Sequence, residues 1–289
     1  MESEYFMHGI RVIQVVILYQ GMNKNYIEDV FQMKITKFLT SEQVKDYNEN
    51  GYLVLRNVFT AQEAAVWRQE SERLLSLEEY LDPNNLRVGY RKVEERLIIE
   101  KIDPVQDLSA VFHDLVNDER ILAPLRDIYM DEPILFKDKL IYKLPGVSGY
   151  SMHQDAAWWQ GFPIEGLISV MVAVDGASTE NGGLELFPGY HERLRSTEGE
   201  LRNMNAKEIA EIDSSKGQIV ETEPGDVILF HSFTPHQSGS NTANVSRRQL
   251  YLTYSPAKNG QLYHAHYQHY CRYVIAARIE HGMTEMYFK

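Results

Sequence analysis

Short apolar segments separated by tight-turn signals fill the second half of the chain, and this pattern constrains the fold most. Residues 167–174 form a continuous apolar run, which predicts a strand buried on both faces. Further strands are predicted over 134–143, 184–187, 218–221, 227–230 and 248–255. Turn signals between them are Gly182-Gly183, Pro188-Gly189 and Pro224-Gly225-Asp226. So many short strands favour a β-sandwich or barrel.

The first half of the chain carries helix signals instead. Thr40 with Gln43, and Thr60 with Glu63, match the capping box that begins an α-helix. Apolar residues recur at helical spacing after the second box, and another amphipathic helix is predicted over 108–116. A short strand is predicted between the two boxes, over 52–55. We therefore expect a mainly β fold with flanking helices.

Charge and cysteine content narrow the class of protein. The chain of 289 residues has 29 Lys and Arg against 41 Asp and Glu, a net charge of −12. This acidity argues against binding to nucleic acid or to an anionic membrane. The apolar run over 12–19 is far shorter than the roughly 20 residues that cross a bilayer. A single cysteine, Cys271, excludes an intrachain disulfide and favours a reducing compartment, so we expect a cytoplasmic protein.

Two histidines and one aspartate carry the strongest chemical signal. His153 and Asp155 are two residues apart, so in extended backbone they point to the same side. His236 follows 83 residues later, beyond the predicted strand over 227–230. Two imidazoles and one carboxylate leave three coordination positions open, the arrangement of non-haem Fe(II) oxygenases. Taken singly, each of these residues is better explained by an ordinary hydrogen bond.

An arginine eleven residues after His236 strengthens the metal interpretation. Arg247 shares one face of a predicted strand with Gln249, Tyr251 and Thr253, whereas Arg248 lies on the other face. A guanidinium binds a carboxylate bidentately, as a dicarboxylic co-substrate requires, and Ser238 can add a hydroxyl. The alternative for Arg247 is a surface salt bridge.

Four stretches in order resemble the phytanoyl-CoA dioxygenase (PhyH) family of Fe(II)/2-oxoglutarate-dependent oxygenases, over roughly residues 38–256. They are "FLTSEQVKDYNENGYLVLRNVFTAQEAAVWRQESERLL", "YKLPGVSGYSMHQDAAWW", "STENGGLELFPGYH" and "EPGDVILFHSFTPHQSGSNTANVSRRQLYLTYSP". The resemblance implies a double-stranded β-helix, or jelly roll, as one domain over 38–289. Residues 1–37 are then a leader, and 257–289 a C-terminal extension in which we expect His264, His266 and His269 to be packing or surface residues.

The same resemblance implies the site residues. His153, Asp155 and His236 would bind Fe(II), and 2-oxoglutarate would place its far carboxylate on Arg247, with a further contact from Ser238. Tyr142 and Asp138 stand where the family's strand before the His-x-Asp motif often has an amide near the co-substrate. With O₂, the expected reaction is hydroxylation of an unactivated C–H bond of a small molecule, with release of succinate and CO₂. Halogenation is not expected, because Asp155 fills the position that halide would need. Desaturation, cyclisation and a non-catalytic metal- or sugar-binding jelly roll are the alternatives.

Three residues suggest the type of substrate. Asp138 shares a predicted strand face with Phe136, Leu140 and Tyr142, a face that we expect to look into the barrel. A buried carboxylate needs a partner, which would be a neighbouring basic side chain or a cationic group of the substrate. Trp158 and Trp159 could enclose such a cation, or could simply pack in the core. We expect a small polar or zwitterionic substrate that bears an amine, with residues 80–100 and 194–215 at the pocket entrance.

Overall fold

The computed structural model describes residues 37–93, 95–196, 201–280 and 282–289, and Leu39–Lys289 form one compact unit. The predicted leader over 1–37 lies outside the described residues, apart from residue 37. The helices are α3 (Ser41–Asn50), α4 (Ala61–Leu75), α5 (Ala110–Val116), α6 (Glu119–Tyr129), α7 (Ala206–Ile209) and α8 (Tyr263–Glu280). None of these described helices is both long enough and apolar enough to cross a membrane.

In the described part of the chain, eleven strands form two antiparallel sheets. They are β1 (Tyr52–Leu55), β2 (Val88–Val93), β3 (Arg96–Ile102), β4 (Pro133–Lys143), β5 (Tyr150–His153), β6 (Ile168–Ala173), β7 (Leu184–Leu186), β8 (Gln218–Val220), β9 (Val227–His231), β10 (His236–Ser238) and β11 (Arg247–Pro256). The large sheet has the order β1-β9-β6-β11-β4-β3-β2, and the small sheet has the order β5-β10-β7-β8. The strands predicted from the sequence are all present, within a residue or two at their ends.

The two capping boxes begin the helices as predicted. The Thr40 side chain accepts a hydrogen bond from the Gln43 amide, and the Gln43 side chain accepts one from the Thr40 amide. Thr60 and Glu63 make the same reciprocal pair at the start of α4. α3 ends at Gly51, whose positive φ of 78° suits glycine, and the chain passes directly into β1.

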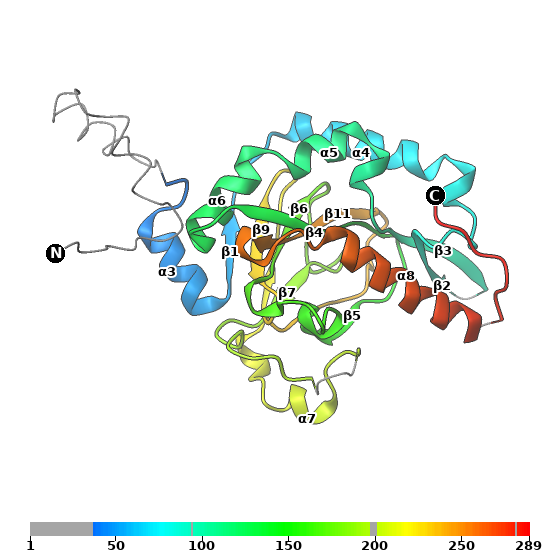
Figure 1. Ribbon diagram of the computed structural model, residues 1–289. Helices are drawn as coiled ribbons and strands as arrows, with labels where there is room; N and C mark the ends of the chain where they lie inside the picture. Colours follow the sequence, from blue (N-terminus) through cyan, green and yellow to red (C-terminus); the bar gives the residue numbers. More distant parts are fainter. Residues whose placement is uncertain (1–36, 94, 197–200, 281) are drawn as a thin grey trace, which may run out of the picture. The chain divides into compact units, whose positions relative to one another are not determined.

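The large sheet is covered on both faces, which explains why β6 is buried along its whole length. On one face, residues such as Val170, Leu229 and Leu252 pack against α3 to α6. On the other face, Met171 and Phe230 pack against Leu184 and other residues of the small sheet. Figure 1 shows α4, α5 and α6 above the large sheet, with β5 and β7 on the opposite side. The strands that carry His153 and His236, β5 and β10, lie in the small sheet.

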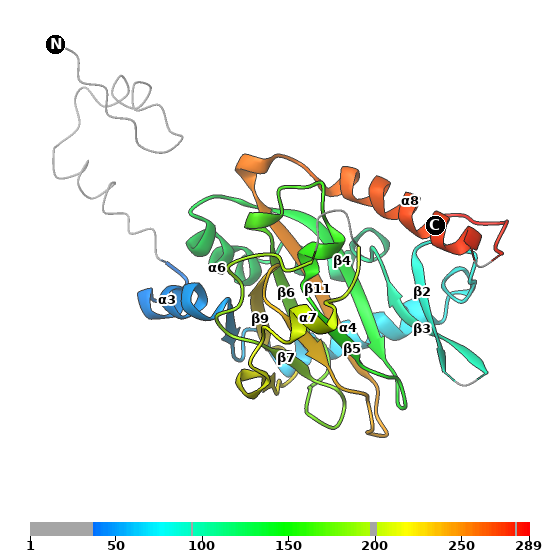
Figure 2. The same cartoon turned by 90° about the horizontal axis from the view of Figure 1, so that it is seen from below.

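Several elements lie outside the sequence prediction, among them β2, β3 and α8. β2 and β3 form a hairpin that extends the large sheet beyond β4. The C-terminal extension folds into α8, which lies beside β4 (Figure 2). Together the hairpin and α8 add a wall at one end of the two-sheet core, next to the strands that carry the candidate site.

Candidate metal centre and substrate pocket

Strand pairing brings the two histidines together. β5 and β10 are antiparallel neighbours, and His236 lies directly opposite His153 in their register. Asp155 follows β5 at the start of a short 3-10 helix, η3 (Asp155–Trp158). Ligand atoms from these three side chains lie within 4.8 Å of one another. The structure therefore brings together His153, Asp155 and His236, the three residues that the sequence predicted to form one cluster.

Hydrogen bonds orient each of these side chains. His153 Nδ1 lies 2.8 Å from the Ser151 carbonyl oxygen, and His236 Nδ1 lies 3.0 Å from the Thr234 carbonyl oxygen. Because a carbonyl oxygen only accepts, both Nδ1 atoms carry the proton, and both Nε2 lone pairs are free to bind a metal. The Nε2 atoms lie 3.8 and 3.9 Å from Asp155 Oδ1.

The electrostatic state of the cluster also suits a divalent cation. Burial lowers the pKa of His153 to about 3 and lowers the pKa of His236, so both imidazoles are neutral at pH 7. Burial opposes ionisation of Asp155, but His236, Lys139 and a hydrogen bond from Ser169 outweigh it and lower the pKa of this carboxyl. Two neutral imidazoles and a carboxylate are ligands that Fe(II) accepts, with positions left for a co-substrate and oxygen.

Arg247 lies in a pocket beside this cluster, together with Ser238. Its side chain is 2% exposed, and its Nε and Nη1 atoms have no hydrogen-bond partner in the described part of the chain. The pocket that Arg247 and Ser238 line also reaches His153, Asp155 and His236. Lys143 Nζ donates to Ser238 Oγ at 2.9 Å. An unpartnered, buried guanidinium next to a metal cluster fits the carboxylate of a dicarboxylic acid.

The neighbouring Arg248 is used differently. Its guanidinium forms ion pairs with Asp175 and Glu72, each at 3.1 Å. Arg248 therefore ties β11 to the helix layer, whereas Arg247 points to the pocket. This difference agrees with the alternation of faces read from the sequence.

The predicted orientation of β4 is wrong, and with it the expected places of Asp138 and Tyr142. Tyr142 is packed in the core on the helix side, where its hydroxyl donates to the Ser71 carbonyl oxygen. Asp138 is fully buried and accepts hydrogen bonds from the amides of Val105 and Gln106, at 2.6 and 2.8 Å. These amides begin η2 (Gln106–Leu108).

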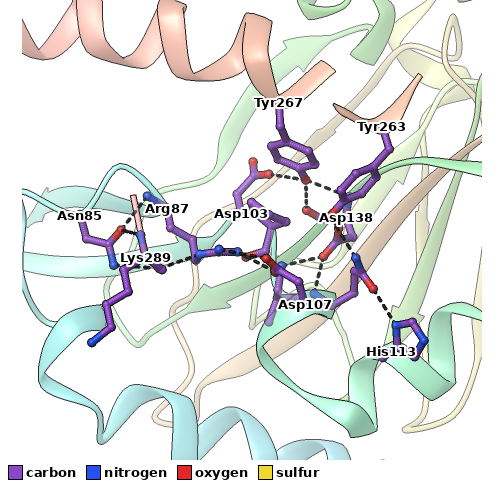
Figure 3. Close-up of polar contacts among 12 residues, drawn as sticks. Asn85, Arg87, Asp103, Asp107, His113, Asp138, Tyr263, Tyr267 and Lys289 are labelled. Atoms are coloured by element: carbon purple, nitrogen blue, oxygen red, sulfur yellow. Dashed lines mark hydrogen bonds and ion pairs between the residues drawn. The ribbon is translucent and has the colours of Figure 1, made fainter. Parts of the chain in front are cut away.

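Asp138 also accepts a hydrogen bond from the Tyr263 hydroxyl of α8 at 2.8 Å (Figure 3). Its partners are thus neither a basic side chain nor a group in the pocket. The strand turns this way because Leu140 and Tyr142 complete the apolar face under the helices. The lysines of β4 occupy the face that lines the pocket.

Trp158 and Trp159 do line the larger of the two cavities, which has a volume of about 250 Å³ and contacts His153 and Asp155. Trp159 packs edge-on against Phe136 at 5.4 Å between ring centres. The remaining lining residues are Lys101, Lys137, Lys139, Tyr150, Leu201, Asn203, His266, His269, Tyr270 and Tyr273. Leu201 and Asn203 belong to the segment 194–215, which was expected at the entrance. His266 and His269 were expected to be packing or surface residues, so the sequence interpretation missed their place in the pocket.

Comparison with known proteins identifies the family. The model of the phytanoyl-CoA dioxygenase (PhyH) family matches residues 47–249. The chain is 30% identical to 2-aminoethylphosphonate dioxygenase of Uncultured bacterium HF130_AEPn_1, over 78% of this chain and 84% of that protein. It is 29% identical to methylphosphonate hydroxylase of Gimesia maris, over 79% of this chain and 85% of that protein.

A solved structure supports the same assignment. The structure of EctD from S. alaskensis with 2-oxoglutarate and 5-hydroxyectoine has a TM-score of 0.67 and 26% identity, and the match covers 76% of this chain and 77% of that chain. This similarity confirms the predicted jelly-roll core, and the donor set described above fits the iron and 2-oxoglutarate of such enzymes. The chain therefore belongs to the phytanoyl-CoA dioxygenase (PhyH) family and is a non-haem iron, 2-oxoglutarate-dependent dioxygenase that hydroxylates a small molecule.

Proposed function

We propose that His153, Asp155 and His236 bind one Fe(II), and that Arg247 and Ser238 hold 2-oxoglutarate beside it. The observation that carries this proposal is a single pocket that joins the His-Asp-His cluster to a buried guanidinium with unpartnered nitrogens. When bound, iron with 2-oxoglutarate and O₂ supplies the oxidising chemistry that hydroxylates a C–H bond. The protein supplies the ligands, the orientation and a partly closed pocket.

Each protein group has a definite task in this proposal. The carbonyl oxygens of residues 151 and 234 hold both imidazoles with Nε2 toward the metal position. Ser169 fixes Asp155 by donating to Oδ2 at 2.7 Å, so that Oδ1 faces the histidines. Arg247 binds the far carboxylate of 2-oxoglutarate. This contact sets where the keto-acid end of the molecule lies relative to the metal position.

The substrate that we propose is a small polar molecule in the cavity walled by Trp158 and Trp159. A volume of about 250 Å³ suits a compact metabolite and is too small for an acyl-CoA thioester. The relatives act on molecules of this kind, as the names 2-aminoethylphosphonate dioxygenase and methylphosphonate hydroxylase state. A substrate contact by Asp138 is not part of the proposal, because its oxygens are already bonded within the fold.

Metal binding and turnover test the proposal together. We expect wild-type protein to bind one Fe(II), measured by anaerobic equilibrium dialysis, and to form succinate from 2-oxoglutarate. His236→Ala should lose both properties and retain a folded circular dichroism spectrum. His113→Ala, which changes an exposed histidine of α5, is the matched control and should keep both. Normal iron stoichiometry and succinate formation in His236→Ala would refute the ligand assignment.

A further inference from the structure

Lysines gather on the wall of the cavity that adjoins the metal cluster. Lys137 and Lys139 project from alternate positions of β4, and Lys101 projects from β3, where it is paired with residue 141 on the same face. Lys139 also lines the pocket of Arg247, so its charge is shared with the co-substrate site. Lys101 and Lys137 line only the larger cavity of the two.

Carboxylates do not balance these charges. Asp103 lies 2.6 Å from Lys137 and 3.3 Å from Lys101, so one carboxylate serves two ammonium groups. Lys139 makes no ion pair with any residue that the structure describes. The nearby Glu100 is paired with Arg91. In a chain with a net charge of −12, this local excess of positive charge is distinctive, and buried charge is costly without a counter-ion.

The opposite wall of the cavity is α8, and it offers polar groups without partners. His266 is 3% exposed, and neither of its ring nitrogens has a hydrogen-bond partner within the described residues. Burial lowers the pKa of His266 to about 2, so its ring is neutral, adds nothing to the lysine charge and has one N–H group that can donate to an anion. A buried polar group left unpaired is destabilising, so a ligand that bonds to it gains affinity.

Tyr270 of α8 positions the two lysines. The Lys137 and Lys101 ammonium groups lie 5.0 and 5.5 Å from the centre of its ring. Aromatic contact and the shared Asp103 hold both cations at the cavity wall without neutralising both of them. The cavity is thus a built site with fixed positive charge on the sheet side and an unpartnered imidazole on the helix side.

We propose that this cavity binds an oxyanion of the substrate, such as a phosphonate, sulfonate or carboxylate, between Lys101, Lys137 and His266. The inference rests on the proposed function, since it orients a C–H bond of the same small molecule toward the metal. This oxyanion contact takes the place of the contact between Asp138 and a substrate cation that the sequence suggested. The residues on the pocket-facing side of β4 are lysines, and Asp138 is not among them.

Binding without turnover tests this inference separately from the proposed function. Protein loaded with Mn(II) and 2-oxoglutarate is titrated calorimetrically with methylphosphonate, methanesulfonate and acetate, and with neutral dimethyl methylphosphonate and cationic choline. We expect at least one anion to bind at least tenfold more tightly than the neutral ester and choline. Equal or tighter binding of the ester or choline, or no binding of any of the three anions, would overturn the inference.

Variants locate the anion. Lys101→Met removes one ammonium group, and His266→Phe fills the same space without nitrogen; each should weaken anion binding about tenfold or more. Lys101→Arg should restore much of the affinity, and Lys45→Met, an exposed lysine of α3, should change nothing. If Lys101→Met and His266→Phe both bind the anion as wild type does, the inference fails. The affinity for 2-oxoglutarate is measured in wild type and in each variant. If wild type does not bind 2-oxoglutarate, that result counts against the proposed co-substrate site and not against the anion site.

Discussion

Replacement of Arg247 by methionine separates a binding role for this residue from a structural role. The side chain is 2% exposed, and two of its nitrogens are buried without a partner in the described part of the chain. A structural arginine would be fully bonded within the fold. Burial lowers the pKa of Arg247, which means that the fold opposes its charge rather than stabilising it. We therefore expect the variant to lose co-substrate affinity and to retain its stability.

The size of the effect follows from the contact that is removed. A bidentate, charge-assisted contact in a buried pocket contributes about 2–4 kcal/mol, between a single charged hydrogen bond and a broken buried ion pair. This range corresponds to roughly 30- to 700-fold in the dissociation constant of 2-oxoglutarate. Lys143 lies near the same pocket and retains part of the attraction, so we expect the lower half of this range. Unfolding free energy should equal or exceed that of wild type, because an unpaired buried cation is removed.

Two measurements check this prediction, with Arg248→Met as the matched control. Calorimetric titration of Mn(II)-loaded protein gives the 2-oxoglutarate affinity, and urea denaturation of the metal-free protein gives the unfolding free energy. Arg248→Met removes the ion pairs with Asp175 and Glu72, so it should lower stability by about 1–2 kcal/mol and leave the affinity nearly unchanged. The reasoning is refuted if Arg247→Met is markedly less stable with unchanged affinity, or if Arg248→Met shows the greater loss of affinity.

Three further predictions concern stability. Asp138→Ala should lower the unfolding free energy by about 3 kcal/mol in urea denaturation, because two η2 amides and the Tyr263 hydroxyl lose their acceptor, and no loss would contradict this assignment. Acidification from pH 7.5 to 5.5 should lower the unfolding free energy of wild type by about 1.4 kcal/mol more than that of His266→Phe. The pKa of His266 is about 2 in the folded state and about 6.5 in the unfolded state. The unfolded state therefore binds the proton first, and wild type loses stability as the pH falls below about 6.5. Equal pH slopes for the two proteins would show that His266 is not held neutral by burial. Thr60→Ala should cost about 1 kcal/mol in thermal or urea unfolding, since it breaks the capping box with Glu63, whereas a cost near zero would mean that the box is not formed.

Local signals in the sequence determined much of the fold. A capping box involves only residues three apart, so Thr40 and Thr60 marked the helix starts without knowledge of the rest of the chain. Turn dipeptides and apolar runs likewise marked five strands of the large sheet, and β7 and β8 of the small sheet. The order of His153, Asp155, His236 and Arg247 identified the family, and these residues lie together in the structure because β5 and β10 are neighbours and β11 lines the same pocket.

Only the tertiary structure decided which face of β4 lines the pocket. Alternation tells which residues share a face, but both faces of this strand are buried, so polarity alone did not choose between them. The choice follows from register: β11 pairs with β4 so that Arg247 lies opposite Lys143, and Tyr251 opposite Lys139. Opposed residues of antiparallel strands share a face, so an arginine that faces the pocket requires lysines there too. Asp138 then points to the helix side.

The role of α8 was equally beyond the sequence pattern. A helix over a polar cavity buries histidine and tyrosine, so it lacks the clear apolar stripe by which a core-packed helix is predicted. His266 and Tyr270 reach the cavity because α8 lies beside β4, and Tyr263 binds Asp138 for the same reason (Figure 3). The sequence thus determined seven of the described strands, the starts of α3 and α4 and the order of the site residues. The pairing of distant strands and the docking of α8 decided which charges face the substrate, because contacts between residues more than 100 positions apart leave no local signal.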